Sequence, residues 1–140
     1  MLIREAQAFD IVDFNRIRNQ LSDNTLPDDI SISQNCYLNY LTKYGKGWVA
    51  MQNNLITGYV ICSKKESSIW ALFVDQAHHR QGIGSALLTQ AINWLNQNGI
   101  NKVYLSTGQN SQAEHFYQKQ GWQKGSLLNN GQVTYSLSTL

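Results

Sequence analysis

The feature that most constrains the fold of this chain is an apolar segment followed by a glycine-containing loop and an amphipathic helix. Residues 69–74 (IWALFV) form a continuous apolar run, which is typical of a buried strand. The loop that follows carries Gly82 and Gly84, where the missing Cβ atoms let several backbone N–H groups approach one cluster of ligand oxygens. Because a helix N-terminus also carries a partial positive charge, the arrangement predicts a site for phosphate or pyrophosphate.

Size and composition predict one ordinary globular core. The sequence has 140 residues, 42% of them hydrophobic, and we expect a single domain over residues 1–140. Its 11 basic and 9 acidic residues give a net charge of +2, which disfavours nucleic acid as a partner. No apolar run approaches the roughly 20 residues of a membrane span, and no signal-peptide layout is present. Cys36 and Cys62 fit no disulfide or metal-binding pattern, so we expect a cytoplasmic protein with reduced, buried thiols and no metal.

Hydrophobic periodicity divides the chain into strands and helices. The expected strands cover residues 2–6, 47–52, 55–62, 69–74 and 101–106, with one or two more between 125 and 140. The expected helices cover residues 9–21, 31–44 and 111–119, together with the helix that follows the glycine loop and ends at Gly99. Asn53 and Asn54 favour a tight hairpin, and Ser111 with Glu114 fits a capping box. The order βααβββαβαββ predicts an α/β (α+β) fold, a mixed central sheet with helices on both faces.

The glycine loop alone leaves several interpretations open. A dinucleotide-binding loop needs a third glycine, where this chain has Leu87, and an acidic residue about 20 positions later, where none occurs. A P-loop needs a lysine followed by serine or threonine, but Gly84 is followed by Ser85 and Ala86. A glycine turn that serves packing alone remains an alternative while the loop is considered in isolation.

Two segments of the chain resemble the motifs of one superfamily. Leu72 to Leu88 resembles the coenzyme A-binding motif of the GCN5-related N-acetyltransferase (GNAT) superfamily. Residues 110–122 (NSQAEHFYQKQGW) resemble its second motif, usually written Asn-x-x-Ala-x-x-Phe-Tyr-x-Lys-x-Gly-Phe. The motifs occur in the right order, and the resemblance covers nearly the whole chain. The chain departs from the family at His79, where Gln or Arg is usual, and we expect this change to affect orientation and pH sensitivity more than binding.

The resemblance implies acetyl-CoA, or another acyl-CoA, as cosubstrate. Backbone N–H groups of the loop would bind its pyrophosphate. Arg80 would add a charge, with a solvated surface arginine as the equal alternative. The pantetheine arm would add to the strand that ends at Val74 and pair with the backbone of Leu72 and Val74. The residues implied in cofactor binding are Leu72, Val74, His79, Arg80, Gln81, Gly82, Ile83, Gly84, Ser85 and Asn110.

The second motif implies roles for Asn110 and Tyr117. The two residues are seven positions apart, so they share a helix face if the helix begins early enough. Asn110 would hydrogen-bond the pantetheine, with a role in starting the helix as an equal and compatible alternative. Tyr117 would direct its hydroxyl at the thioester sulfur as the catalytic residue, with a half-buried core tyrosine as the alternative. A phenol pKa near 10 exceeds a thiol pKa near 8.5, so full proton transfer is uphill by about 2 kcal/mol and hydrogen bonding with late protonation is the better description.

The acceptor side is less defined by the sequence. Many relatives have a glutamate on the fourth strand that acts as the base, but residues 69–74 contain no acid and we assign no base. In the family, the second helix and the preceding loop form the acceptor wall. Here the helix carries three tyrosines that could line the acceptor pocket, with core and surface packing as the alternative. The loop carries three acids that could attract a cationic amine, with a solvated turn as the alternative. These residues are Tyr37, Tyr40, Tyr44, Asp23, Asp28 and Asp29.

These features together predict an acyl-CoA-dependent N-acetyltransferase that moves an acetyl group to a primary amine by direct attack. The acceptor would be a small-molecule or protein amine. The enzyme would be a monomer or homodimer, with neither nucleic acid nor membrane as a partner. The alternative is a non-catalytic acyl-CoA-binding or regulatory domain, which would keep the glycine loop and lose the catalytic apparatus.

Overall fold

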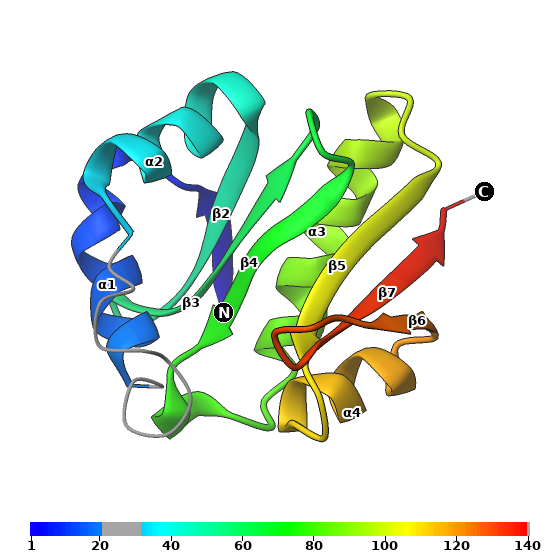
Figure 1. Cartoon of the computed structure of the whole chain (residues 1–140). Coiled ribbons are helices and arrows are strands. Elements are labelled where there is room, and N and C mark those ends of the chain that lie inside the picture. The colour runs from blue at the N-terminus through cyan, green and yellow to red at the C-terminus, as the bar shows by residue number, and fades with distance from the viewer. Residues whose placement is uncertain (21–31, 140) are drawn as a thin grey trace.

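The framework of the molecule is one seven-stranded sheet with the order β1-β2-β3-β4-β5-β7-β6 (Figure 1). The computed structural model describes residues 1–20 and 32–139. The strands are β1 (Leu2–Glu5), β2 (Gly45–Gln52), β3 (Leu55–Ser63), β4 (Ser68–Val74), β5 (Lys102–Gly108), β6 (Gln123–Leu127) and β7 (Gln132–Ser138). The α-helices are α1 (Ile11–Asn19), α2 (Gln34–Asn39), α3 (Ile83–Gln97) and α4 (Gln112–Lys119). This confirms the predicted element order and the mixed sheet.

Helices cover both faces of the sheet and bury an apolar layer on each side. On one face, α1 and α2 pack on β2, β3 and β4, and Phe14 and Tyr59 are completely buried there. On the other face, α3 buries Leu87 and Leu95 together with Tyr117 of α4. None of the helices in the described ranges is both long and apolar enough to cross a membrane.

A gap between β4 and β5 divides the sheet. The two strands are parallel but pair only at Ser68 and Tyr104, near the start of β4. Beyond this point β4 stays paired with β3 as far as Val74, and β5 stays paired with β7 along its whole length. The halves of the sheet therefore separate toward the C-terminal end of β4, as Figure 1 shows. The facing strand edges are left without a strand partner along this stretch.

A β-bulge in β4 determines which side chains face each layer. Ile61 pairs with Ala71 and Cys62 pairs with Ile69, so Trp70 is the extra residue on β4. Trp70 and Ala71 consequently both belong to the layer under α1 and α2. After the bulge the alternation resumes, and residues 72 and 74 pack on the α3 side.

Most predicted boundaries are confirmed to within a few residues, and the differences are local. The helix expected over 9–21 begins as a 3-10 turn, Ala8–Asp10, before α1. The helix expected over 31–44 begins at Gln34 and continues as a π-helix, Tyr40–Tyr44. Asn53 and Asn54 have φ values of 52° and 65°, which confirms the tight hairpin. The loop expected over residues 22–29 lies outside the described residues.

The cysteines are both free thiols, as the sequence predicts. Cys62 is completely buried in β3, and burial raises the pKa of its thiol to about 12. Cys36 in α2 is only half-buried, which corrects the expectation that both thiols are buried. Cys36 directly precedes Tyr37, whose side chain is buried in the core. Adjacent residues of a helix point in different directions, so Cys36 keeps some contact with solvent.

Candidate functional site

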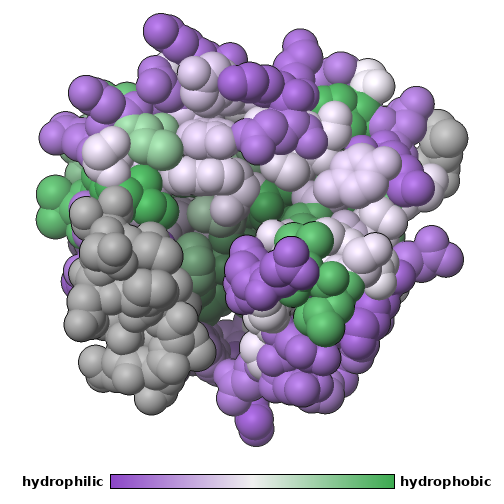
Figure 2. Space-filling model, in the orientation of Figure 1, coloured by the Kyte–Doolittle hydropathy of each residue, from purple (hydrophilic) through white to green (hydrophobic). Residues whose placement is uncertain are grey.

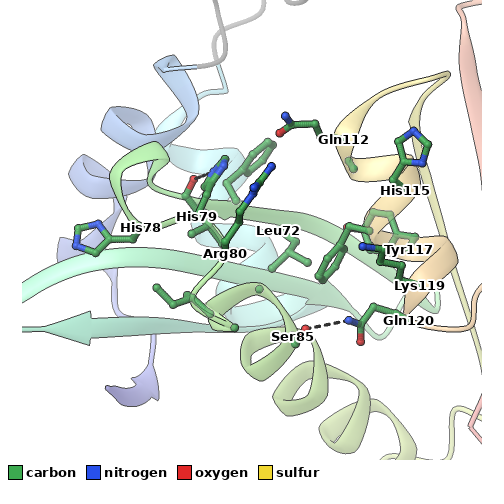
Figure 3. A pocket seen from close by; sticks show the side chains of 17 residues that line it. Leu72, His78, His79, Arg80, Ser85, Gln112, His115, Tyr117, Lys119 and Gln120 are labelled. Carbon is green, nitrogen blue, oxygen red and sulfur yellow. Dashed lines mark hydrogen bonds between the residues drawn. The ribbon is translucent and has the colours of Figure 1, made fainter.

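A cavity of about 640 Å³ opens where β4 and β5 separate. It lies between the end of β4, the following turn, the first turn of α3, and α4 (Figure 3). Leu72, Val74 and Phe116 contribute an apolar lining, and none of the described Asp or Glu residues belongs to that lining. The nitrogen-bearing side chains of the lining are His78, His79, Arg80, Gln112, His115, Lys119 and Gln120. The cavity therefore suits an elongated ligand with an apolar part and an anionic part.

The glycine loop enters α3 with a backbone geometry suited to an anion. Arg80 and Gly82 have positive φ values of 65° and 79° on either side of Gln81, and Gly82 is the N-cap of α3. Ala86 N–H donates to Gly82 O at 3.1 Å, so the N–H groups of residues 83–85 precede this bond and have no partner within the helix. Left-handed residues next to a helix start make a concave set of N–H groups that binds anions. This is the segment for which the sequence predicts pyrophosphate binding.

The edge of β4 that faces the gap presents the backbone of Leu72 and Val74. Asp75 N–H donates to Thr57 O of β3 at 2.8 Å, so residue 75 is directed toward β3. Because successive residues of a strand direct their backbone groups to opposite edges, residues 72 and 74 are directed toward β5. The Val74 carbonyl is engaged by the His79 ring at 2.9 Å, and since a carbonyl only accepts, His79 Nε2 carries the proton (Figure 3). The Leu72 backbone and the Val74 N–H thus remain open to a ligand.

Tyr117 presents an unengaged hydroxyl to the cavity. Its ring packs against Phe116 and Trp122, with ring centroids 5.2 and 5.6 Å away, and only 7% of the residue is exposed. Tyr117 lines the cavity, and its hydroxyl makes no hydrogen bond to a described residue. Burial raises the pKa of Tyr117, so the phenol stays protonated at neutral pH. The hydroxyl is therefore available as a hydrogen-bond donor to a ligand.

Two residues implied in cofactor binding lie outside the cavity lining. Asn110 precedes α4, because Ser111 is the N-cap, so the two-turn alignment of Asn110 with Tyr117 does not form. Asn110 instead has a φ of 61°, and its N–H donates to Glu114 Oε1 at 2.8 Å. The Gln81 side chain is exposed and bonds to Gln52 at 3.4 Å. The remaining residues implied in cofactor binding all line the cavity: Leu72, Val74, His79, Arg80, Gly82, Ile83, Gly84 and Ser85.

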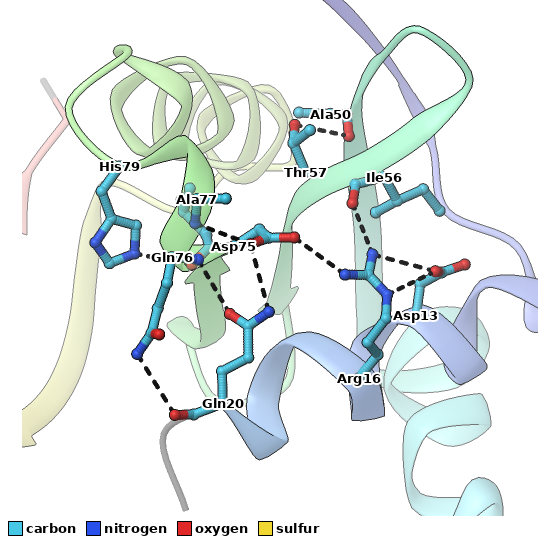
Figure 4. Close-up of polar contacts among 11 residues, drawn as sticks. Asp13, Arg16, Gln20, Ala50, Ile56, Thr57, Asp75, Gln76, Ala77 and His79 are labelled. Atoms are coloured by element: carbon cyan, nitrogen blue, oxygen red, sulfur yellow. Dashed lines mark hydrogen bonds and ion pairs between the residues drawn. The ribbon is translucent and has the colours of Figure 1, made fainter.

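A polar network holds the turn between β4 and the glycine loop (Figure 4). Asp75 accepts the Ala77 N–H at 3.0 Å within this turn. From α1, Arg16 and Gln20 donate to the same carboxylate at 3.0 and 3.3 Å, and Arg16 also donates to Ile56 O at 2.8 Å. Burial by itself raises the pKa of Asp75, but these hydrogen bonds outweigh burial and hold the pKa below its usual value. Asp75 is therefore an ionised anchor for the turn and a weak base.

Aromatic side chains cover β4 on its α1–α2 face. Trp70 stacks on Tyr40 with ring centroids 3.9 Å apart, and the Tyr40 O–H donates to Glu66 at 2.5 Å. Tyr37 is completely buried, so of the three tyrosines expected at the acceptor wall only Tyr40 and Tyr44 keep exposed surface. The face of the molecule seen in Figure 2 is hollowed near its centre, with hydrophobic atoms inside the hollow and mostly hydrophilic atoms around it. The expected acidic residues of this wall, Asp23, Asp28 and Asp29, lie outside the described residues.

Sequence reasoning missed several α4 residues that line or support the cavity. Gln120 Nε2 donates to Ser85 Oγ at 2.9 Å and so links α4 to α3 across the cavity (Figure 3). Helical spacing from Tyr117 points to the lining residues Ala113 and Gln120, which lie one turn away on either side, and Phe116 is its direct neighbour in the chain. Glu114 is buried. The sequence gives no signal for this, because the glutamate of a capping box can lie on the surface as readily as in the interior.

Comparison with known proteins identifies the family. Residues 13–122 match the model of the acetyltransferase (GNAT) family. Human N-acetyltransferase 8 is 32% identical over an alignment of 95 residues, and the match covers 61% of this chain and 42% of that protein. The matched part of the chain thus spans less than half the length of this relative.

Solved acetyltransferases share the fold. The PaiA N-acetyltransferase of Thermoplasma acidophilum, solved in complex with coenzyme A, aligns with a TM-score of 0.84 at 15% identity over 98% of both chains. The putative acetyltransferase YncA of Salmonella typhimurium, solved with acetyl-CoA, aligns with a TM-score of 0.80 at 17% identity over 99% of this chain and 94% of that one. The family match includes the glycine loop, the gap beside β4 and all of α4. The chain belongs to the GNAT family of acetyltransferases.

Proposed function

We propose that this chain is an N-acetyltransferase that moves the acetyl group of acetyl-CoA to a primary amine at the gap between β4 and β5. The observation that supports this most is that one cavity joins the N–H groups of residues 83–85 to the unengaged hydroxyl of Tyr117. An anion site at one end and a hydrogen-bond donor at the other match the pyrophosphate and the thioester of one acyl-CoA molecule. The related proteins solved with coenzyme A and with acetyl-CoA support the same donor.

The donor is proposed to lie along the cavity from the loop to α4. Its pyrophosphate is bound by the N–H groups at the start of α3, with the Arg80 guanidinium beside them. The pantetheine arm adds to the free edge of β4 and pairs with the backbone of Leu72. A pantetheine carbonyl can accept the Val74 N–H, but a pantetheine N–H that donates to the Val74 carbonyl has to displace the His79 ring. His79 thereby competes with the donor for one backbone group.

The proposed transfer forms a C–N bond and breaks a C–S bond at the same carbonyl carbon. The amine lone pair attacks the thioester carbonyl, and the tetrahedral intermediate collapses with the electron pair leaving on sulfur. The Tyr117 hydroxyl stabilises the developing thiolate by a hydrogen bond. Since the ordinary phenol pKa already exceeds the thiol pKa and burial raises the pKa of Tyr117 further, full proton donation is disfavoured. The thiolate then acquires its proton late, from water or from the ammonium formed in the attack.

The amine must reach the thioester in its neutral form. A lysine-like amine with a pKa near 10.4 is neutral in only about one molecule in 2,500 at pH 7. The carboxylates that flank β4 are engaged: Asp75 by Arg16, and Glu66 by Tyr40. We therefore assign no base among the described carboxylates. The role of Asp23, Asp28 and Asp29 in attracting a cationic amine remains a prediction from the sequence.

The second candidate function is that of a non-catalytic acyl-CoA-binding or regulatory domain. The engaged carboxylates favour it, because no described acid is positioned to deprotonate an amine. Tyr117 favours the enzyme, because its protonated hydroxyl faces the cavity and is available to stabilise a thiolate, which binding without transfer does not require. The cytoplasmic location and the monomeric or homodimeric state remain predictions from the sequence.

Two measurements together decide between these functions. Binding of acetyl-CoA is measured by the rise in melting temperature that it causes. At a free acetyl-CoA concentration of 100 times Kd, mass action stabilises the folded protein by about 2.7 kcal/mol. Release of CoA thiol is measured with a panel of small amines and of peptides with free α- or ε-amines. Binding with amine-dependent release supports the enzyme, whereas binding without release by any amine supports the regulatory domain. A protein that does not bind acetyl-CoA contradicts both.

A further inference from the structure

One buried carboxylate fastens α4 to its surroundings. The Glu114 side chain is 6% exposed and accepts the Asn110 N–H at 2.8 Å and the Tyr135 O–H at 2.5 Å. Lys124 Nζ lies 3.4 Å from the same carboxylate, on the outside of the molecule. The donors come from the turn before α4, from β7 and from β6. Glu114 therefore joins the start of α4 to both strands of the C-terminal hairpin.

The connection continues along the helix. Gln118 Nε2, one turn after Glu114, donates to the Tyr135 hydroxyl oxygen at 3.0 Å. The hydrogen-bond chain Gln118–Tyr135–Glu114–Asn110 thus holds the second turn of α4, its first turn and the residue before its cap. The Tyr135 bond and then the Asn110 N–H are the main causes that lower the pKa of Glu114, so the carboxylate is ionised at neutral pH.

Tyr117 needs such an external support. α4 has eight residues, and a helix of this length is marginal without tertiary contacts. The ring of Tyr117 is packed by Phe116 and Trp122, but its hydroxyl bonds to no described residue that would fix its height above the cavity. The orientation of the hydroxyl therefore depends on the position of the helix. Glu114 lies between Asn110 and Tyr117, one turn from Tyr117.

We propose that Glu114 is a positioning residue for acetyl transfer. Its bond to Tyr135 sets the height of the Tyr117 hydroxyl, and its bond to the Asn110 N–H holds the turn before α4. This inference rests on the proposed function. Glu114 touches neither donor nor acceptor, since it does not line the cavity. Its loss moves the hydroxyl away from the sulfur and weakens the transition state, while the glycine loop and β4 still bind the donor.

The variants Glu114→Gln and Tyr135→Phe test the proposal. Glutamine keeps the size of the side chain but turns one acceptor into an N–H group that faces a donor. Phenylalanine removes the hydroxyl and with it both Tyr135 bonds, the one donated to Glu114 and the one accepted from Gln118. We expect each variant to lower kcat about tenfold, which corresponds to about 1.4 kcal/mol, and to leave the KM for acetyl-CoA within about twofold. Arg4→Met is the matched control, because Arg4 donates at 2.9 Å to Asp10, another buried carboxylate far from the cavity, and we expect unchanged kcat.

A double-mutant cycle separates positioning from general support of the fold. If Glu114 acts through Tyr117, then Glu114→Gln in a Tyr117→Phe background lowers kcat by less than about twofold, because the group that it positions is already gone. A full further tenfold loss in that background overturns the proposal, as does an unchanged kcat in both single variants. Tyr135→Phe carries the same test if the Glu114 variant does not fold. Absence of amine-dependent CoA release by the wild-type protein contradicts the proposed function instead.

Discussion

Single residues show both what the sequence determines about the site and what it leaves open. Gly82 needs a positive φ, and Tyr117 recurs at a fixed place in the second motif, so both positions were predictable. The resemblance implies that Asn110 binds the pantetheine, and the seven-residue spacing puts it on the face of Tyr117 only if the helix begins early enough. That spacing applies only inside a helix, and Ser111 caps the helix one residue later. Local capping chemistry, which acts over one or two residues, decides such a case.

Replacing Tyr117 by phenylalanine isolates its hydroxyl. The ring contacts with Phe116 and Trp122 remain, so we expect a folded protein that binds acetyl-CoA normally. Losing one hydrogen bond to a developing anion lowers kcat by about 10²-fold or more where the donor matters. Steady-state kinetics with the best acceptor, together with direct donor titration, measure this. An unchanged kcat removes Tyr117 from the mechanism, and loss of donor binding assigns the hydroxyl a structural role.

Gly82 and Gly84 are needed for different reasons, Gly82 for its backbone conformation and Gly84 for the room beside it. A Cβ added at Gly82 meets nothing within 4 Å. An alanine there would still have to adopt a φ of 79°, which costs an L-residue about 1–2 kcal/mol. A Cβ at Gly84 has no such strain and lies 3.4 Å from the Phe116 ring, in ordinary contact across the cavity. We therefore expect Gly84→Ala to keep its stability and to weaken acetyl-CoA binding about tenfold, because the methyl group narrows the cleft.

Calorimetric titration and a urea unfolding curve for Gly84→Ala check this expectation. Gly82→Ala serves as the comparison that loses stability first. Equal acetyl-CoA affinity in Gly84→Ala and wild type shows that the donor does not pass between Gly84 and Phe116.

Secondary-structure elements were predicted well where one physical rule dominates. The Asn53-Asn54 hairpin, the glycine that ends α3 and the serine that caps α4 each follow from backbone chemistry at one site. Periodicity predicts neither the β4 bulge at Trp70 nor the separation of β4 from β5, although the resemblance implies an open strand edge where the pantetheine arm would add. Both features arise from the pairing of β4 with other strands of the sheet. The apolar run 69–74 is compatible with a regular strand as well as with a bulged one, so it does not indicate either feature.

The turn between β4 and α3 is held by an ionised carboxylate, which predicts a pH dependence of stability. Because the pKa of Asp75 is below its usual value in the folded protein, its contribution is present at neutral pH and is lost as the pH falls below about 4. Asp75→Asn should lower the free energy of unfolding by about 1 kcal/mol at pH 7, since charge-assisted bonds from Arg16 and Gln20 are lost.

Urea unfolding of wild type and Asp75→Asn at pH 7, 5, 4 and 3 measures the difference. We expect the two free energies to differ at pH 7 and 5 and to converge as the pH falls below about 4. A difference that stays constant over this range contradicts the ionised anchor.

The whole molecule was recognisable from its sequence because two motifs occur in order within one domain. The proposed donor side depends mostly on backbone groups at the glycine loop and along β4, and such groups are specified by a few residues. The proposed acceptor side depends on side chains that only the fold brings together. Trp70 and Tyr40 illustrate this, since they stack although 30 positions separate them in the sequence.

The most direct test of the central claim is the fate of the acetyl group itself. Wild-type protein is incubated with acetyl-CoA carrying an isotopically labelled acetyl group and with the amine panel, and the products are weighed by mass spectrometry. We expect one labelled acetyl group on the amine nitrogen for each CoA thiol released, at a rate that falls about 10²-fold in Tyr117→Phe. Stable binding of labelled acetyl-CoA with no label on any amine and no thiol released would contradict acetyl transfer.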